Sequence, residues 1–541
     1  MSEDRDDSQQ AGAAWSRRDR WARAVLAGLG GLIAGFCALA VAELVAAVVR
    51  PEAGPVTAVG GAVIDRTPPA VKEFAVRSFG TEDKLVLRLG ILLLLALFAI
   101  GIGVLALRHR RLGSAAVLVF GLIGAVSAVG RPEGAPADAL PSVVGALVAA
   151  GVLYLLVGRL TPKLRPSPAA GERDGTSQGF DRRGFVVAAT AATAASAGAG
   201  LLGRRLTASV QAGAAASRKD LVLPVPDSAA APVPAGADLR IRGLSPFVTP
   251  NKDFYRVDTA LVVPRVDAGA WRLRIHGEGV PRTVTVGLDD LMRREIIARD
   301  ITLTCVSNEV GGPYVGNARW LGVRLADLLH EAGVRPPSKG GPADQIVARS
   351  VDGMTIGTPV ETVMDGRDAM LAFGMNGEPL PFEHGFPVRM VVPGLYGYVS
   401  ACKWIKDIEL TTFAAYDAYW VRQDWAQEAP VKTESRIDTP RPFASPKPGI
   451  VPVAGVAWAQ HRGISRVEVR VDGGDWHTAR LAAADTRDTW RQWVWEWPAT
   501  SGHHTLEVRA TDGTGATQTG RRAGTVPDGA TGWHSVAVDV P

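Results

Sequence analysis

A lone cysteine stands where a strand-like run gives way to a polar loop. Cys305 ends the alternating run 301–305 and precedes the loop 306–312, which is rich in small and polar residues. As a thiolate it would be a soft ligand for a metal ion. Spacing alone favours a buried inert thiol, and a disulfide with Cys402 is a second alternative in an oxidising compartment. The third cysteine is Cys37, and the absence of a CxxC pair argues against zinc or an iron–sulfur cluster.

Other chemistry-bearing residues follow Cys305 in a fixed order. They lie in segments 304–308, 316–323, 375–381, 384–389, 392–394 and 403–404. In their order and in the identity of their residues, the segments resemble the sulfite oxidase family of molybdenum enzymes. The later segments 455–458, 464–469 and 471–474 resemble that family's dimerisation sandwich. The resemblance runs from about residue 239 to the C-terminus.

The resemblance implies a molybdenum–molybdopterin cofactor and a role for each matching residue. Cys305 would ligate molybdenum as a thiolate. His384, Arg389 and Lys403 would hold the pterin and its phosphate, with the backbone at Ala401 and Cys402 close to the same group. The remaining cofactor-binding residues match the family's N-terminal cofactor segment more loosely: Asn251, Tyr255 and Arg256.

The match fails where the family holds its sulfite anion. Asn308 is retained after the cysteine, but Glu309 and Val310 replace an arginine pair. A further family arginine falls near Asp258, and the family's active-site tyrosine falls near Trp425. A like charge at ~4 Å raises the free energy of a bound anion by about 4 kcal/mol at an effective dielectric near 20. We therefore expect that sulfite is not the main substrate.

The reaction class that the resemblance implies is two-electron oxygen-atom transfer at a molybdenum centre. Cys305, Asn308 and Glu309 are the candidate catalytic residues. Glu309 would handle a proton or orient the substrate; the alternative is a solvated loop carboxylate. Two rival functions stay open: a sulfite oxidase proper, and a cofactor-less binding module with Cys305 inert or paired to Cys402. The sequence does not specify the substrate, the redox direction or the electron partner.

The elements that position these residues are visible as periodic patterns. Alternation predicts strands over 271–275 and 301–305, and an amphipathic helix is expected over 323–332. From about residue 445 the chain is strand-like, with alternating runs at 467–471, 493–497 and 506–510. Short strands at this spacing indicate an antiparallel β-sandwich.

The N-terminal part of the chain is of a different kind. Apolar runs at 25–49, 89–107, 112–130, 140–157 and, more weakly, 184–203 are long enough to cross a bilayer. The basic residues cluster before the first run, between the second and third, and after the fourth, which places these segments in the cytoplasm. The net charge of +5 thus indicates membrane topology and not nucleic-acid binding. No haem is expected, because none of the five runs contains a histidine.

The fifth run begins with a pair of arginines. Arg182 and Arg183, followed by Gly184 and Phe185, resemble a twin-arginine export motif, which is read on proteins exported already folded. The alternative is an ordinary positively charged flank of a membrane anchor. Export after cytoplasmic cofactor insertion would place everything beyond Arg205 outside the cytoplasmic membrane.

These patterns together predict a multi-domain chain of 541 residues. We expect a transmembrane α-helical bundle at 1–205, an Ala/Pro-rich linker at 206–238, an α+β sulfite-oxidase-type molybdopterin-binding domain at 239–415 and an immunoglobulin-like β-sandwich at 416–541. The expected partners are the membrane, a small-molecule substrate, an unknown electron carrier and, through the sandwich, a second copy of the chain.

Overall fold

The computed structural model describes residues 17–67, 71, 83–131, 134–161 and 180–541. The chain divides into two compact units, Met1–Val210 and Gln211–Pro541. Basic residues 163, 165 and 173, which the topology prediction used, lie outside the described residues.

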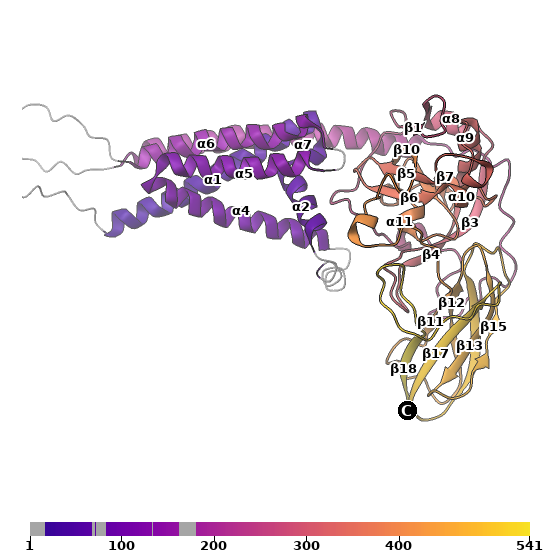
Figure 1. Ribbon diagram of the computed structural model, residues 1–541. Coiled ribbons are helices and arrows are strands. Elements are labelled where there is room, and N and C mark those ends of the chain that lie inside the picture. Colours follow the sequence, from indigo (N-terminus) through magenta and orange to yellow (C-terminus); the bar gives the residue numbers. More distant parts are fainter. Residues whose placement is uncertain (1–16, 68–70, 72–82, 132–133, 162–179) are drawn as a thin grey trace, which may run out of the picture. The chain divides into compact units, whose positions relative to one another are not determined.

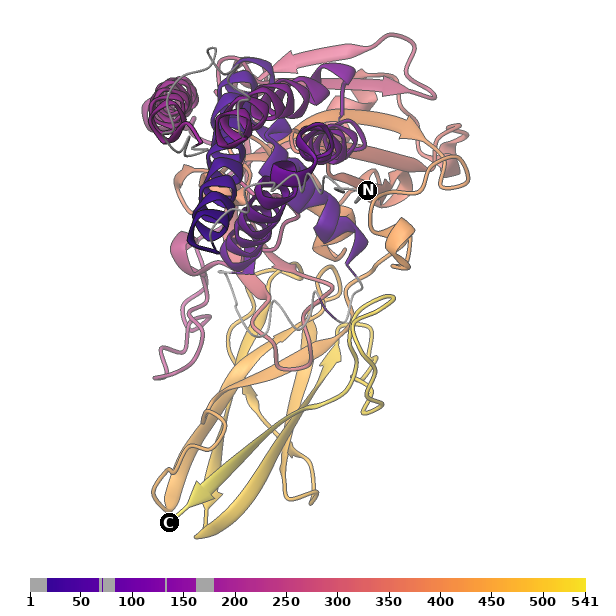
Figure 2. The ribbon, with the colours of Figure 1, turned by 90° about the vertical axis from the view of Figure 1, so that its left-hand side faces the viewer.

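The first unit is helical (Figures 1 and 2). Within the described residues, five helices are long and apolar enough to span a membrane, as the five apolar runs predict. They are α1 (Arg17–Val49), α4 (Asp83–Arg108), α5 (Arg110–Val129), α6 (Leu140–Leu160) and α7 (Arg182–Asp220); the shorter α2 (Pro55–Arg66) packs against α5 and α4.

Small residues let the helices of this unit approach closely. A Cβ on Gly31 of α1 would lie 1.9 Å from the carbonyl oxygen of Ala99 in α4, and one on Gly103 would lie 2.1 Å from that of Ala27. Large apolar side chains such as Leu93 and Leu97 are exposed instead. Backbone contact through glycine with apolar side chains facing outward is typical of helices that pack in lipid.

Helix α7 continues well beyond the predicted end of its apolar run. It reaches Asp220 and so includes the first part of the segment that was predicted to be a linker. Alanine has the highest helix propensity, and the Ala-rich stretch after Leu206 sustains the helix. Arg218 in its last turn donates to the carbonyl oxygens of Pro379 and Leu380, at 2.8 and 2.7 Å. The rest of the predicted linker, which belongs to the second unit, also packs on that unit: Asp227 accepts from the Ile296 N–H at 2.8 Å.

The second unit begins with an α+β part that contains two sheets. One sheet is mixed, because β1 and β10 are parallel, and the other is antiparallel. One has the order β2-β1-β10-β5-β6 and the other β3-β4-β7-β8, with β9 paired to β7. Their bounds are β1 Arg272–Gly277, β2 Val284–Gly287, β3 Ile297–Thr304, β4 Val315–Arg324, β5 Gln345–Ser350, β6 Thr355–Pro359, β7 Met370–Met375, β8 Glu378–Pro379, β9 Arg389–Val391 and β10 Ile405–Thr411. The short helices are α8 Leu288–Met292, α9 Leu325–Glu331, α10 Val360–Val363 and α11 Gly397–Ser400.

The predicted strands at 271–275 and 301–305 correspond to β1 and β3. The predicted helix over 323–332 starts later, at Leu325, because Val323 and Arg324 still pair with β7. A continuous core of fully buried side chains, including Trp320, Phe373 and Phe386, lies between the elements of this part.

The C-terminal part consists of two four-stranded antiparallel sheets, ordered β11-β12-β16-β15 and β14-β13-β17-β18 (Figure 1). The strands are β11 Glu434–Thr439, β12 Gly449–Trp458, β13 Ile464–Val471, β14 His477–Thr478, β15 Arg480–Leu481, β16 Arg491–Ala499, β17 Gly502–Asp512 and β18 His534–Val540. Both sheets contribute to one buried cluster that includes Val453, Val469, Trp493 and Val508. The sheets therefore form a sandwich, in which alternate residues point inward.

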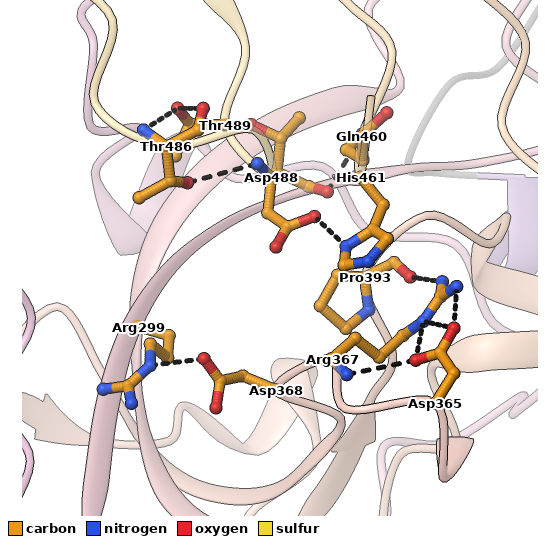
Figure 3. A network of polar contacts seen from close by, with 11 residues as sticks. Arg299, Asp365, Arg367, Asp368, Pro393, Gln460, His461, Thr486, Asp488 and Thr489 are labelled. Atoms are coloured by element: carbon orange, nitrogen blue, oxygen red, sulfur yellow. Dashed lines mark hydrogen bonds and ion pairs between the residues drawn. The ribbon is translucent and has the colours of Figure 1, made fainter. Parts of the chain in front are cut away.

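Polar contacts join the sandwich to the α+β part (Figure 3). His461 Nδ1 lies 3.0 Å from Asp488 of the same sandwich, and the Asp488 carbonyl oxygen accepts from Thr302 N–H of β3 at 2.9 Å. Arg367 donates to the carbonyl oxygen of Pro393 at 2.6 Å beside them. Strand β3, which ends just before Cys305, is thus hydrogen-bonded to the sandwich through Thr302.

Candidate active site

Cys305 follows the last residue of β3, where the chain leaves the sheet. Its N–H donates to the Tyr314 carbonyl oxygen at 2.9 Å, so the loop closes on itself. The thiol is buried, and its Sγ lies 2.9 Å from Ser307 Oγ. Burial raises the pKa of Cys305, while the Ser307 hydrogen bonds and the charge of Lys403 oppose that rise. All three cysteines are free thiols, so the Cys305–Cys402 disulfide is not formed.

Cys305 opens into a cavity that we call the Cys305 cavity. Loops from five regions of the second unit enclose it: 254–259, 305–307, 350–356, 384–404 and 420–425. Of the predicted site residues, the following line it: Tyr255, Cys305, His384, Arg389, Ala401, Cys402 and Lys403. The structure therefore brings together residues that are up to 148 positions apart in the sequence, counting from Tyr255 to Lys403.

Arg389 is a buried cation on one side of this cavity. It starts strand β9, is 5% exposed, and lies with its guanidinium 4.9 Å from the ring centre of Trp320. One Nη donates to the His384 carbonyl oxygen at 3.2 Å, whereas Nε has no hydrogen-bond partner among the described residues. Burial lowers the pKa of Arg389 to about 10, so the group is still charged at neutral pH. A buried, partly unsatisfied guanidinium is suited to an anionic ligand.

His384 is held by the segment that carries Asn251. Its Nε2 lies 3.1 Å from the Asn251 carbonyl oxygen, and burial together with Arg389 lowers the pKa of His384 to about 4. The imidazole is therefore neutral near pH 7. The Asn251 side chain bonds to Met375 and Asn376 at 3.2 and 2.8 Å and does not line the cavity. Asn251 thus acts on the site through its backbone.

Lys403 is paired with a carboxylate. Its Nζ lies 2.8 Å from Asp258 and 3.3 Å from the Glu383 carbonyl oxygen, and burial lowers the pKa of Lys403 to about 8. Arg256 bonds to the same Asp258 oxygen at 2.8 Å but is exposed and outside the cavity lining. Asp258, at the position predicted to match a family arginine, therefore forms ion pairs with both Lys403 and Arg256.

Asn308 and Glu309 lie outside the cavity lining. Asn308 is buried and accepts the Tyr314 N–H at 2.8 Å, which shapes the loop after Cys305; its Nδ2 has no partner among the described residues. Glu309 is exposed. The structure thus supports a positioning role for Asn308, and the predicted proton-handling role of Glu309 has no geometric support.

An aromatic wall closes the other side of the cavity, and sequence reasoning missed most of it. We define it as Tyr398, Trp420 and Trp425. The Tyr398 and Trp425 ring centres are 5.7 Å apart, and those of Trp420 and Trp425 are 6.1 Å apart. The rings therefore pack against one another without space for a ligand between them. Residues 416–433, expected within the sandwich, precede its first strand, and the clustering of aromatic residues at 416–425 was the available signal.

The donor set fits a molybdenum–pterin cofactor. A phosphate would satisfy the unpartnered Nε of Arg389, and the Cys305 thiol, one of two buried thiols in the lining, would complete a metal whose other ligands come from the pterin. Among the described residues no group of three or more His, Cys, Asp or Glu side chains could hold a metal by itself. The metal would therefore have to arrive with its own ligands.

Comparison with known proteins defines the class of this domain. Residues 260–420 match the family model described as an oxidoreductase molybdopterin binding domain. This part of the chain is a molybdopterin-binding oxidoreductase domain similar to that of the sulfite oxidase family, and its cofactor is the molybdenum–pterin group.

Three relatives illustrate the range of similarity. The chain is 30% identical to human mitochondrial sulfite oxidase over 308 residues, which is 48% of this chain and 55% of the relative. It is 29% identical to rice nitrate reductase 1 over 46% of this chain and 32% of the relative. The solved structure of the sulfane dehydrogenase SoxCD from Paracoccus pantotrophus is 25% identical, covers 55% of this chain and 84% of its own, and has a TM-score of 0.47. The chain thus spans about half the length of its sulfite oxidase relatives.

Proposed function

We propose that this chain is a membrane-anchored, extracytoplasmic molybdenum oxidoreductase that transfers an oxygen atom to or from a small substrate other than sulfite. The observation that carries the proposal is the convergence of the buried Cys305 thiol, Arg389, His384 and Lys403 on one cavity. The two-electron oxygen-atom chemistry is supplied by the cofactor when it is bound. The protein's own residues bind it, exclude water and select the substrate.

Each of the converging groups has a defined part in binding. Cys305 supplies a thiolate, whose formation from a buried thiol is favoured only when a cation is beside it. Arg389 and Lys403 carry the positive charge for the phosphate, and neutral His384 offers a hydrogen bond without adding charge. The Ser307 hydroxyl, 2.9 Å from the Cys305 sulfur, orients the thiolate.

The cavity favours a neutral substrate with an apolar flank. Lys403 is neutralised by Asp258, and Arg389 is enclosed between Trp320 and the His384 carbonyl oxygen. Among the described residues, the rest of the lining carries no further cation: it includes the aromatic wall, apolar side chains such as Met354 and Ile356, and the carboxylate of Asp352. With Lys403 paired to Asp258 and Arg389 assigned to the cofactor phosphate, a sulfite dianion would lose its hydration here without gaining a cation of its own. A sulfoxide or an amine N-oxide would place its apolar part against the aromatic wall.

Elemental analysis of the purified full chain tests the cofactor. We expect about one molybdenum per chain in the wild type and its loss in Cys305→Ala, with Cys402→Ala as the matched control that keeps the metal. Equal metal in the wild type and Cys305→Ala would contradict the ligand assignment. No metal in any of the three proteins would favour the cofactor-less binding module.

A gain-of-function variant tests the substrate class. Trp425→Arg introduces a cation into the aromatic wall, so we expect sulfite oxidation with a dye acceptor to rise by about tenfold or more from a low value. Reduction of dimethyl sulfoxide should fall in the same variant. Trp476→Arg, at a tryptophan of the sandwich outside the cavity, is the control. Strong sulfite oxidation by the wild type would contradict the proposal that the substrate is not sulfite and would favour a sulfite oxidase proper.

The membrane anchor, its orientation and the partners are part of the proposal. Five long apolar helices support the anchor, and the distribution of basic residues supports a cytoplasmic N-terminus. We infer that the electrons are exchanged with an external one-electron carrier and that the sandwich, immunoglobulin-like in its paired antiparallel sheets, joins two copies of the chain. Crosslinking of the purified chain tests the latter, since a monomer at all concentrations would exclude it.

A further inference from the structure

Three buried polar atoms without partners belong to residues of the β11–β12 pair and of the turn that follows it. They are Glu434 Oε1, Trp458 Nε1 and Gln460 Oε1, and none has a hydrogen-bond partner among the described residues. Their side chains are 5%, 0% and 1% exposed. Most buried polar groups in native proteins are hydrogen-bonded, so three buried polar atoms without partners in neighbouring residues need an explanation.

The sheet register brings the side chains of Glu434 and Trp458 to one face, and Gln460 lies just beyond the end of β12. Glu434 begins β11 and stands directly opposite Trp458 of β12 in the antiparallel pair. Directly opposed residues share a face of the sheet, and Gln460 follows two positions after Trp458. The group thus offers an acceptor, a donor and a second acceptor, which are the partners that one or two internal waters need.

The same group reaches the residue before Cys305. Gln460 Nε2 donates to the Thr302 carbonyl oxygen and to Thr304 Oγ1, both at 2.9 Å. Tyr396 is buried beside it, and the pKa of Tyr396 is raised by burial and by the charge of Glu434. A Cβ on the next residue, Gly397, would stand 3.7 Å from the Thr304 carbonyl oxygen.

Lys432 is a cation whose charge acts on Glu434. Lys432, two residues earlier, is engaged at 2.8 Å by Asp528 and at 2.7 Å by the Gly529 carbonyl oxygen. Glu434 acts in turn on buried Tyr396, which also feels the charge of Asp528. Burial raises the pKa of Glu434 to about 8, with Lys432 opposing the rise. The carboxyl is therefore protonated at neutral pH.

We propose that Glu434, Trp458 and Gln460 enclose an internal water site beside Tyr396, and that Glu434 holds there a proton which is exchanged with the Cys305 cavity during turnover. The inference rests on the proposed function. In the reducing direction the substrate's bond to oxygen breaks and two O–H bonds of water form, with two electrons from the external carrier and two protons. In the opposite direction the same protons are released. Glu434 is a positioning and proton-storing group, since it does not line the cavity.

Infrared spectroscopy tests the stored proton without turnover. In the purified full chain at pH 7 we expect the carbonyl stretching band of a buried protonated carboxylic acid, which disappears as the pH rises through about 8. The band should be missing in Glu434→Gln and present in Glu468→Gln, a matched change on β13 of the same sandwich. A wild type without the band, or a band that persists in Glu434→Gln, would overturn the proposal.

Kinetics test the exchange. With dimethyl sulfoxide and a reduced viologen dye, the wild-type turnover rate should fall about tenfold per pH unit above pH 8. Glu434→Gln should be slower at pH 7, with an unchanged KM and molybdenum content and without that limb of the profile, and Glu434→Asp should restore part of it. A wild-type profile in Glu434→Gln would overturn the exchange. If the wild type contains no molybdenum or does not turn over, the proposed function fails, and the infrared result alone decides the proton site.

Discussion

At the scale of single residues, charge pairing distinguishes the two cations of the candidate site. Lys403 and Arg389 are both cations of the Cys305 cavity, yet their surroundings differ. Lys403 shares a carboxylate with Arg256, whereas Arg389 is buried against Trp320 with one nitrogen unsatisfied among the described residues. Arg389 therefore has the larger unmet demand for an anion and is the main candidate to hold the cofactor phosphate.

Replacing Arg389 tests this assignment. Arg389→Met keeps the volume but removes charge-assisted hydrogen bonds worth roughly 1.5–3 kcal/mol, so molybdenum and pterin retention should fall by about tenfold or more. The metal-free variant should be at least as stable as the metal-free wild type, because a buried unpaired cation is removed. Metal analysis after dialysis and chemical denaturation measure the two effects. Arg299→Met, which breaks an ion pair with Asp368 outside the cavity, should retain the metal.

At the scale of elements, the sandwich is joined across its sheets by neutral buried histidine as well as by apolar packing. His534 of β18 accepts the Ile437 N–H of β11 at 3.0 Å through Nδ1. Burial, with the nearby charge of Arg436, lowers the pKa of His534 to about 4. The hydrogen bond requires the unprotonated nitrogen, so acid weakens the contact between the two sheets.

The sign of the pH effect follows from this lowered pKa. An unfolded histidine takes up a proton near pH 6.5, whereas the folded one does so only near pH 4. The stabilisation is thus complete above pH 6.5 and is lost as the pH falls toward 4. Between pH 7 and pH 5 we expect His534→Asn to lose about 2 kcal/mol less of its free energy of unfolding than the wild type. Denaturant titrations followed by tryptophan fluorescence measure this, and the exposed His503→Asn on β17 should behave as the wild type.

At the scale of the whole molecule, one helix belongs to both units. Helix α7 starts with Arg182 and Arg183 in the first unit and ends in the second, where Arg218 bonds to two backbone carbonyl oxygens. The arginine pair is on the surface; Arg182 pairs with Asp19 at 3.3 Å. An exposed pair at the start of an apolar helix is accessible to an export receptor, which supports the proposed twin-arginine signal.

Conservative replacement of the pair separates export from simple charge. Arg182→Lys with Arg183→Lys keeps both positive charges, so positive-inside topology is preserved, whereas a twin-arginine receptor should fail to bind. We expect the catalytic unit to become inaccessible to protease added outside spheroplasts. Arg204→Lys with Arg205→Lys, in the same helix, is the matched control. Equal protease access in both double variants would contradict the export signal.

The sequence by itself determined the elements and the class. Apolar runs predicted the five long helices because crossing lipid demands uninterrupted apolar length, and alternation predicted β1, β3 and the sandwich strands. The order of motifs around Cys305 identified the molybdopterin-binding domain, since each motif is a short run that can be recognised in the sequence by itself and the runs follow one another in a fixed order. The pairing of Lys403 with Asp258, the aromatic wall, the exposure of Glu309 and the buried group around Glu434 were decided only by the tertiary structure. These features depend on residues far apart in the chain and on burial, which sets both pKa values and hydrogen-bond demand. Most of the site residues predicted from the sequence thus line the Cys305 cavity, whereas most of the aromatic wall of the same cavity was not predicted.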